Sequence, residues 1–142
     1  MPQATQQRAL SITQIATGIA ILVFWLLFFT VGMAPAKPPP CYFAFEHAFP
    51  LPDTILAIAL MASGVNVLKG GIWGHGVSLA CAGGLLFLGV LDFSFTAQNG
   101  GFSGPIIEAL QSGIIPLWCA AVGLWIVAVH GTGSRTATFT ER

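Results

Sequence analysis

Asp92 is the acidic residue most in need of an explanation, because it lies within the apolar stretch 80–95 of a chain in which only 7% of residues are charged. An ionised carboxylate at the centre of a bilayer costs at least about 2.5 kcal/mol to insert, so we expect this one to be protonated, paired or turned toward a polar interior. Thr96 at i+4 and Asn99 at i+7 continue a polar stripe if the segment is helical. A buried aspartate can also hydrogen-bond a neighbouring helix and only specify packing, and this alternative stays open.

Three further polar residues upstream are candidates for the same site. Glu46 and His47 are an adjacent acid and base in an aromatic segment, and histidine is the side chain whose charge changes between about pH 5 and 8. Adjacent residues do not face each other on a helix, so either is expected to pair with Asp92 rather than with the other. Asp53 follows a proline and precedes an apolar run, where its carboxylate either caps a helix or joins the site.

The motifs of common catalytic and metal sites are missing. The sequence contains no GxSxG, Walker loop, GxGxxG or HExxH, so no catalytic residue is assigned. One histidine among several carboxylates matches no dedicated ligand spacing, and we expect neither a metal nor a cofactor. His75 and His130 fall near one predicted interface, where antiparallel packing would bring them to one level, but ordinary interfacial roles explain them without haem.

The composition indicates a membrane protein. Of 142 residues, 55% are hydrophobic, with five basic and five acidic side chains. The mean hydropathy of +0.81 is far too high for a water-soluble domain of this length. Five basic residues cannot neutralise several phosphates, which excludes nucleic acid as an expected partner. The expected partners are the lipid bilayer and either further copies of the chain or a larger membrane complex.

Four apolar segments are long enough to be considered as spans. The chain is therefore predicted to be all-α: a polytopic four-helix membrane bundle in one domain, 1–142, with spans at about 10–33, 53–68, 76–97 and 105–130. The first apolar segment is too long for a signal peptide, so we expect it to be retained. The second span is short for a core of about 30 Å, so either the bilayer thins or the loop dips back toward Asp92.

The charges on the connecting segments predict an orientation. The basic residues predicted on one side are Arg8, Lys69, Arg135 and Arg142, and the other side has Lys37 alone. Both termini should therefore be cytoplasmic, with the proline-rich and aromatic loop 34–52 outside. The acids show the opposite distribution, with Glu46, Asp53, Asp92 and Glu108 in the outer half and Glu141 in the inner tail.

Part of the chain resembles a known group of proteins. The segment FEHAFPLPD at 45–53, followed by LGVLD at 88–92 and QNG at 98–100, resembles small uncharacterised bacterial four-span membrane proteins. The resemblance covers the second and third spans, about half of the chain. It implies that Glu46, Asp53, Asp92 and Asn99 belong to one site in a bacterial cytoplasmic membrane protein, and it implies no activity.

We therefore expect an integral membrane protein with an outward-facing buried carboxylate site. Asp92 would bind a proton, a cation or a small ligand there, with Glu46 and His47 at the mouth. One alternative is an accessory or structural subunit of a larger membrane complex, with an extensive apolar face and no internal cavity. The other is a membrane enzyme that uses Asp92 and Glu46 as an acid and base on a lipid-soluble substrate, which a pocket open to lipid would favour.

Overall fold

The fold is all-helical, as predicted. A computed structural model describes residues 3–35 and 37–136, and no strand occurs in these ranges. The helices are α1 (Gln3–Thr30), α2 (Tyr42–Glu46), α3 (Pro50–Leu68), α4 (Gly74–Gln98) and α5 (Ile106–Thr136). All but α2 contain a segment that is long and apolar enough to cross a bilayer. Glu141 and Arg142 lie outside the described residues, as do the side chains of Glu108 and Arg135.

The second long helix starts earlier than the sequence indicated. α3 begins at Pro50 instead of Asp53, because a proline in the first helical turn loses no backbone hydrogen bond that the helix needs. Phe49 is the N-cap residue and provides no side-chain cap, and its carbonyl accepts a hydrogen bond from the Asp53 backbone N–H at 2.8 Å. Asp53 therefore lies within the first turn and is not the capping residue.

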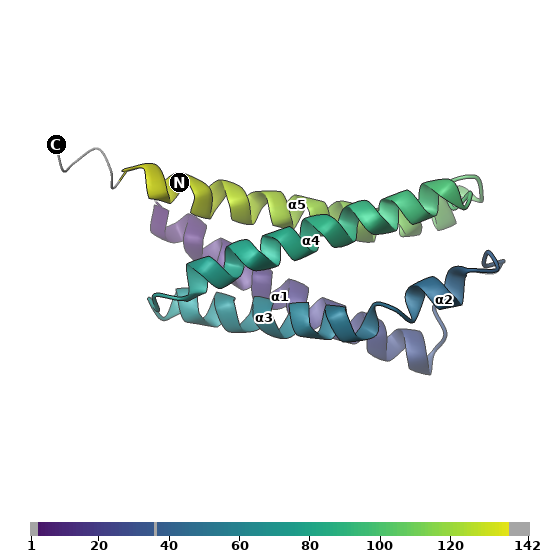
Figure 1. Ribbon diagram of the computed structural model, residues 1–142, viewed down its shortest axis with the longest axis horizontal. Helices are drawn as coiled ribbons and strands as arrows, with labels where there is room; N and C mark the ends of the chain where they lie inside the picture. Colours follow the sequence, from purple (N-terminus) through teal and green to yellow (C-terminus); the bar gives the residue numbers. More distant parts are fainter. Residues whose placement is uncertain (1–2, 36, 137–142) are drawn as a thin grey trace.

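The four long helices form two antiparallel pairs (Figure 1). α1 packs mainly on α3 and α4 packs mainly on α5, while α3–α4 contacts and a smaller α1–α5 contact join the pairs. α1 begins and α5 ends at the end of the bundle that also holds the α3–α4 turn, and we call this the terminal end. α2 and the α4–α5 turn lie at the opposite end, which we call the α2 end. Arg8 and Lys69 consequently lie toward the terminal end, and Lys37 lies in the connector at the α2 end.

Two glycines end helices in the same way. α3 and α4 each finish at a glycine with positive φ, +71° at Gly70 and +73° at Gly100, a conformation that other residues rarely adopt. The following backbone N–H groups then close the last turns, from Gly71 to the Asn66 carbonyl at 2.8 Å and from Gly101 to the Thr96 carbonyl at 2.9 Å. These closures fix where α4 starts and ends relative to its neighbours.

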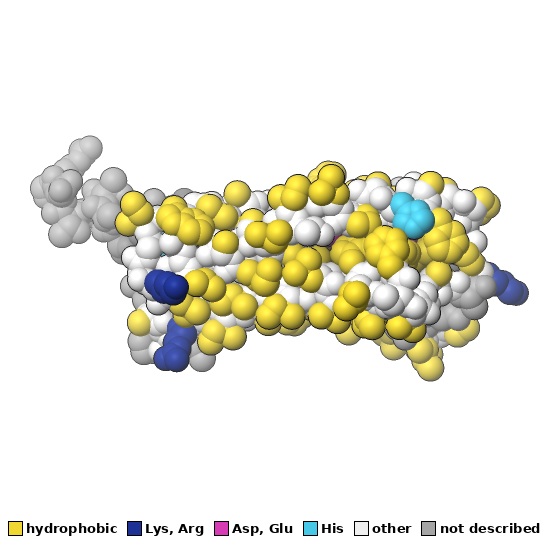
Figure 2. All heavy atoms as spheres, turned by 90° about the horizontal axis from the view of Figure 1, so that it is seen from below, with side chains coloured by type: hydrophobic (Ala, Val, Ile, Leu, Met, Phe, Trp, Pro, Cys, Tyr) yellow, Lys and Arg dark blue, Asp and Glu magenta, His cyan; other side chains and the backbone are white. Residues whose placement is uncertain are grey.

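Large hydrophobic side chains lie on the surface as well as in the core. Leu10, Leu60, Leu85 and Ile126 are fully buried, yet large hydrophobic side chains are also exposed along every long helix. Figure 2 shows hydrophobic side chains covering the length of one face, with basic side chains only near its two ends. An exposed apolar surface of this extent indicates a lipid or protein environment instead of water.

A buried glutamine links three helices near the terminal end. Gln14 of α1 is fully buried, and its Oε1 accepts hydrogen bonds from Ser63 Oγ of α3 at 2.9 Å and Ser78 Oγ of α4 at 3.0 Å. Among the described residues, Gln14 Nε2 and the hydroxyl of Ser11 have no partner. Hydrogen bonds of this kind tie apolar helices together where the hydrophobic effect gives little preference for one arrangement.

Gly89 sets the separation of α4 and α5. A Cβ at this position would lie 2.6 Å from the Pro116 carbonyl oxygen and 3.2 Å from the Ala120 backbone nitrogen, so Gly89→Ala must push two backbones apart. We expect it to lower the free energy of unfolding in detergent by about 1–3 kcal/mol. Gly83→Ala is the matched control on the same helix, because its Cβ would meet nothing within 4 Å. That variant should be neutral or up to about 1 kcal/mol more stable, and equal effects of the two would contradict the assigned contact.

Candidate functional site

Three carboxyl groups from three helices lie near enough to one another at the α2 end of the bundle for their charges to interact. Glu46 ends α2, Asp53 lies in the first turn of α3, and Asp92 lies in the last third of α4. Their charges interact, Glu46 with Asp53 and Asp92 with both. Asp53 is buried, with 8% of its surface exposed, and the other two are half-buried. Within the described part of the chain no basic side chain forms an ion pair with any of them, so we refer to them as the carboxyl cluster.

Contacts between α2 and α4 bring Glu46 into this cluster. Cys41 Sγ donates a hydrogen bond to Asn99 Oδ1 at 3.7 Å, and the ring of Phe45 stacks on Phe95 with 3.8 Å between centroids and 6° between planes. Phe95 and Asn99 follow Asp92 by three and seven residues and so share its face of α4. α2 therefore lies along the predicted polar stripe, and Asn99 acts by holding α2 and the end of α4, where its Nδ2 donates to the Phe95 carbonyl at 2.9 Å.

Asp53 is fixed by a tryptophan from the first helix. Trp25 Nε1 of α1 donates a hydrogen bond to Asp53 Oδ2 at 2.9 Å, and both side chains are buried. The indole is itself held by Phe24 and Phe28, whose ring centroids lie 5.1 and 5.2 Å away in edge-on contacts. The hydrogen bond between helices that was considered for Asp92 is thus made by Asp53 instead. Among the described residues, no hydrogen bond joins the Asp92 carboxyl to another helix.

Tyr42 and Glu46 form a hydrogen-bonded pair one helical turn apart. Burial has the largest effect and raises the pKa of Glu46, the hydrogen bond from the Tyr42 phenol lowers it, and the negative charge of Asp53 raises it again. The pKa of Glu46 lies above its ordinary value as a result. Burial, followed by the charges of Glu46 and Asp92, also raises the pKa of Tyr42, so the phenol stays protonated and remains a donor.

The contacts of His47 are with aromatic side chains, and none joins it to the carboxyl cluster among the described residues. Its ring is exposed, stacks on Phe29 at 5.9 Å with 10° between planes, and makes further ring contacts with Phe28 and Phe43. These contacts hold the segment after α2 against the end of α1. Of the five residues expected at the site, Glu46, Asp53 and Asp92 come together, Asn99 positions α2, and His47 faces the aromatic end of α1.

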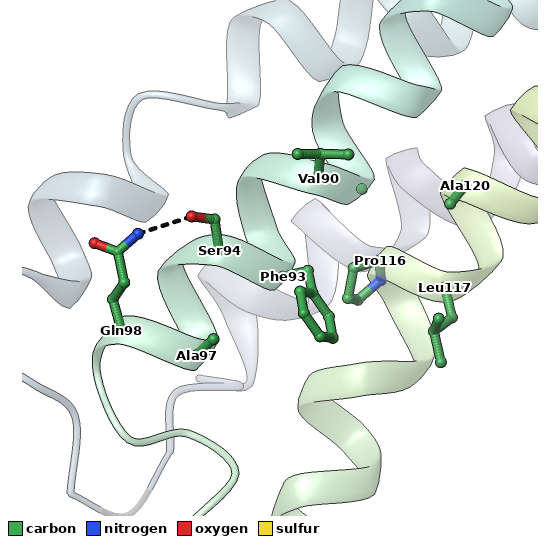
Figure 3. A pocket seen from close by; sticks show the side chains of 9 residues that line it. Val90, Phe93, Ser94, Ala97, Gln98, Pro116, Leu117 and Ala120 are labelled. Carbon is green, nitrogen blue, oxygen red and sulfur yellow. Dashed lines mark hydrogen bonds between the residues drawn. The ribbon is translucent and has the colours of Figure 1, made fainter.

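An open groove of about 570 Å³ runs between α4 and α5 (Figure 3). Its lining is largely apolar and consists of Gly89, Val90, Phe93, Ser94, Ala97, Gln98, Pro116, Leu117 and Ala120. Polar groups occur only at one end, where Gln98 Nε2 donates a hydrogen bond to Ser94 Oγ at 2.8 Å. No residue of the carboxyl cluster lines this groove.

Residues 4–101 match the family model described as a domain of unknown function, DUF8058. The chain belongs to this family. The DUF8058 match includes nearly all of α1 and the whole of α2, α3 and α4, so the whole carboxyl cluster lies within it, as do Trp25 and Tyr42. Helix α5 lies beyond the match. No curated protein and no solved structure matches the chain.

Sequence reasoning missed the residues of the DUF8058 segment that contact the carboxyls. Trp25 lies in an apolar run, and an indole N–H buried in a membrane helix needs an acceptor. Tyr42 precedes Glu46 by four residues, a spacing at which side chains meet on a helix. Gln14, which contacts Ser63 and Ser78 and no carboxyl, was also missed, although a buried amide in an apolar span must find partners on other helices.

Titration of Glu46 should make stability depend on pH. Because its folded-state pKa is raised above the reference value of 4.5, the protonated carboxyl stabilises the fold. This contribution is fully present below about pH 4.5 and is lost as the pH rises through the folded pKa. Glu46→Gln, which cannot ionise, should therefore flatten the decline of Tm above about pH 4.5. Tyr42→Phe should move the decline to higher pH, because the hydrogen bond that lowers the pKa is gone; identical profiles for all three proteins would refute the assignment.

Proposed function

We propose that this chain is an integral membrane protein whose outward-facing carboxyl cluster takes up positive charge, as a proton or a cation. Four apolar helices, an apolar surface, and Arg8 and Lys69 at the terminal end against Lys37 at the α2 end support insertion with both termini in the cytoplasm. The resemblance to bacterial four-span proteins favours the bacterial cytoplasmic membrane. The α2 end then faces the outside of the cell.

The observation that carries the proposal is the meeting of three interacting carboxyls without a basic partner in the described chain. Like charges at close range in a low-dielectric site do not all ionise unless positive charge is bound among them. Asp53 is fixed by Trp25 and Glu46 is bonded to Tyr42. Asp92 has no such bond among the described residues, so its oxygens are the ones available to hold the proton or cation.

The structure gives less support to the two alternative functions, a membrane enzyme and an accessory subunit. An enzyme acting on a lipid-soluble substrate would present its acid and base to a lipid-open pocket, and the groove between α4 and α5 contains neither Asp92 nor Glu46. An accessory subunit would use the exposed apolar surface to bind a larger complex, although lipid alone explains that surface equally well. Isolation from native membranes with a partner in fixed stoichiometry would favour the subunit.

Proton displacement tests the proposal directly. The purified chain in lipid nanodiscs is placed in weakly buffered solution near neutral pH and titrated with Na⁺, K⁺, Ca²⁺ or tetramethylammonium while the pH is recorded. If the cluster binds a cation, the titration should release protons up to a saturating amount. If the cluster holds only a proton, no protons should be released, but the wild-type protein should have a larger buffering capacity than the Glu46→Gln/Asp92→Asn double variant. A wild-type protein that neither releases protons nor buffers more than the double variant would contradict the proposal.

A further inference from the structure

The buried side-chain atoms that find no partner in the described chain all lie toward the terminal end of the bundle. They are Ser11 Oγ, Gln14 Nε2 and both ring nitrogens of His130. Ser11 and Gln14 are 1% and 0% exposed, so bulk solvent does not reach them directly. Most buried polar side-chain atoms in proteins have a hydrogen-bond partner, either protein or ordered water, so this local concentration of unpaired atoms points to a bound molecule.

The Gln14 amide is bonded at one end only. Its Oε1 accepts hydrogen bonds from Ser63 Oγ at 2.9 Å and from Ser78 Oγ at 3.0 Å, which uses both acceptor positions and leaves the NH₂ group without an acceptor. Turning the amide over would direct the NH₂ group to the serines and leave the oxygen unpaired instead. In either orientation, one polar atom of Gln14 is buried and unpaired, which costs free energy.

Ser11 provides the second unpaired group beside this amide. It precedes Gln14 by three residues on α1, a spacing that places the two Cβ atoms about 5–6 Å apart on the same face. The two side chains do not bond to each other, because both atoms are without a partner in the described chain. A water molecule both donates and accepts, and it needs at least two polar partners to be held inside a protein. We propose that Gln14 and Ser11 bind one internal water molecule, which accepts from the amide N–H and bonds to the Ser11 hydroxyl.

Polar side chains continue from this site to the terminal end of the bundle. His75 precedes Ser78 by three residues and so lies one turn closer to that end on the same face of α4. The ring of His75 is half-buried and contacts the ring of His130, with 4.7 Å between centroids. Water can therefore exchange with the site by way of the histidines and Ser78.

Apolar side chains separate the water site from the carboxyl cluster. Leu60 lies one turn from Ser63 on α3, and Leu85 lies two turns from Ser78 on α4, both in the direction of the α2 end. Both leucines are fully buried. The water site thus opens toward the terminal end only, and its failure would leave the function proposed for the cluster untouched.

Proton-detected solid-state NMR tests the site, because magnetisation passes from water only to protons that lie close to it. The full chain is produced in H₂O from deuterated carbon sources and reconstituted in lipid bilayers. Gln14→Met, which has a similar length and no amide, identifies the Gln14 side-chain signal by its loss. We expect a water cross-peak at the Gln14 amide in the wild-type protein and none at the backbone N–H of Leu85.

Two serine variants show whether the cross-peak comes from the proposed water. Ser11→Ala removes one of its two partners and should abolish the cross-peak, whereas Ser63→Ala removes only a donor to the Gln14 oxygen and should keep it. A visible Gln14 signal without a water cross-peak in the wild-type protein would overturn the site. Persistence of the cross-peak in Ser11→Ala would show that Ser11 is not a ligand, and its loss in Ser63→Ala would show transfer from an exchanging serine hydroxyl; either result would also overturn the site. Circular dichroism checks that each variant is folded, and if Ser11→Ala is not, the wild-type and Ser63→Ala spectra decide.

Discussion

Asp92→Asn is expected to weaken the uptake of a proton or cation at the α2 end by about tenfold to a thousandfold while leaving the fold intact. Asparagine has nearly the same shape as aspartate, so the change removes charge without opening a cavity. A carboxylate within about 4–6 Å of a titrating group or ion shifts its equilibrium by about 1–3 pKa units, which corresponds to an affinity loss of about tenfold to a thousandfold. Proton displacement and cation titration in nanodiscs measure this loss.

Asp53→Asn is the matched comparison for Asp92→Asn. It also removes one negative charge from the cluster, but the asparagine oxygen can still accept the hydrogen bond from Trp25. We expect it to weaken uptake less than Asp92→Asn does, because Asp53 is already fixed and Asp92 is not. A larger effect at Asp53 would move the binding role to that carboxyl, and unchanged uptake in Asp92→Asn would remove the role assigned to Asp92.

Trp25→Phe should cause a large loss of stability. The change leaves the buried Asp53 carboxyl without its indole donor, and hydrogen bonds to charged groups contribute about 1.5–3 kcal/mol. Lost contacts with Phe24 and Phe28 add to this effect, since edge-on aromatic pairs contribute about 0.5–1.5 kcal/mol. The free energy of unfolding in mixed micelles measures the sum.

A second tryptophan shows how much of the stability loss comes from the hydrogen bond to a carboxyl and how much from replacing an indole by a phenyl ring. Trp118 also donates through Nε1, to the Thr17 hydroxyl at 3.2 Å, but it is 52% exposed and its acceptor is neutral. Trp118→Phe should therefore cost only about 0.5–1.5 kcal/mol. The double variant Trp25→Phe/Asp53→Leu should cost less than the sum of its single changes, because no carboxyl is left without a donor. Equal costs at the two tryptophans would contradict the account of Asp53.

The positions of the long helices were largely predictable from the sequence. Apolar runs of sufficient length locate all four, and the glycines at 70 and 100 mark where two of them end. The start of α3 was misplaced, because the prolines at 50 and 52 were interpreted as preceding the helix, although proline is compatible with a first turn. The short helix α2 was expected only as part of the proline-rich and aromatic loop 34–52.

The sequence predicted which acidic residues belong to the site better than it predicted the contacts that those residues make. Asp92 stands out because hydrocarbon penalises a charge, and the short second span suggested that Glu46 and Asp53 approach it. The stacking of Phe45 on Phe95 and the bond from Trp25 to Asp53 depend on how separate helices pack, and no local pattern in the sequence encodes them. His47 was predicted to belong to the same site, and the contacts it makes are with the rings of Phe28, Phe29 and Phe43.

Infrared spectroscopy of the carboxyl groups tests the central claim most directly, because protonated and ionised carboxyls absorb at well-separated frequencies. The wild-type protein in nanodiscs at pH 7, without added metal cations, should show a protonated carboxyl band that shifts in D₂O and is diminished in Asp92→Asn. A wild-type spectrum at that pH that contains only ionised carboxylates, unchanged in shape by Asp92→Asn, would contradict a site in which three uncompensated acids hold positive charge.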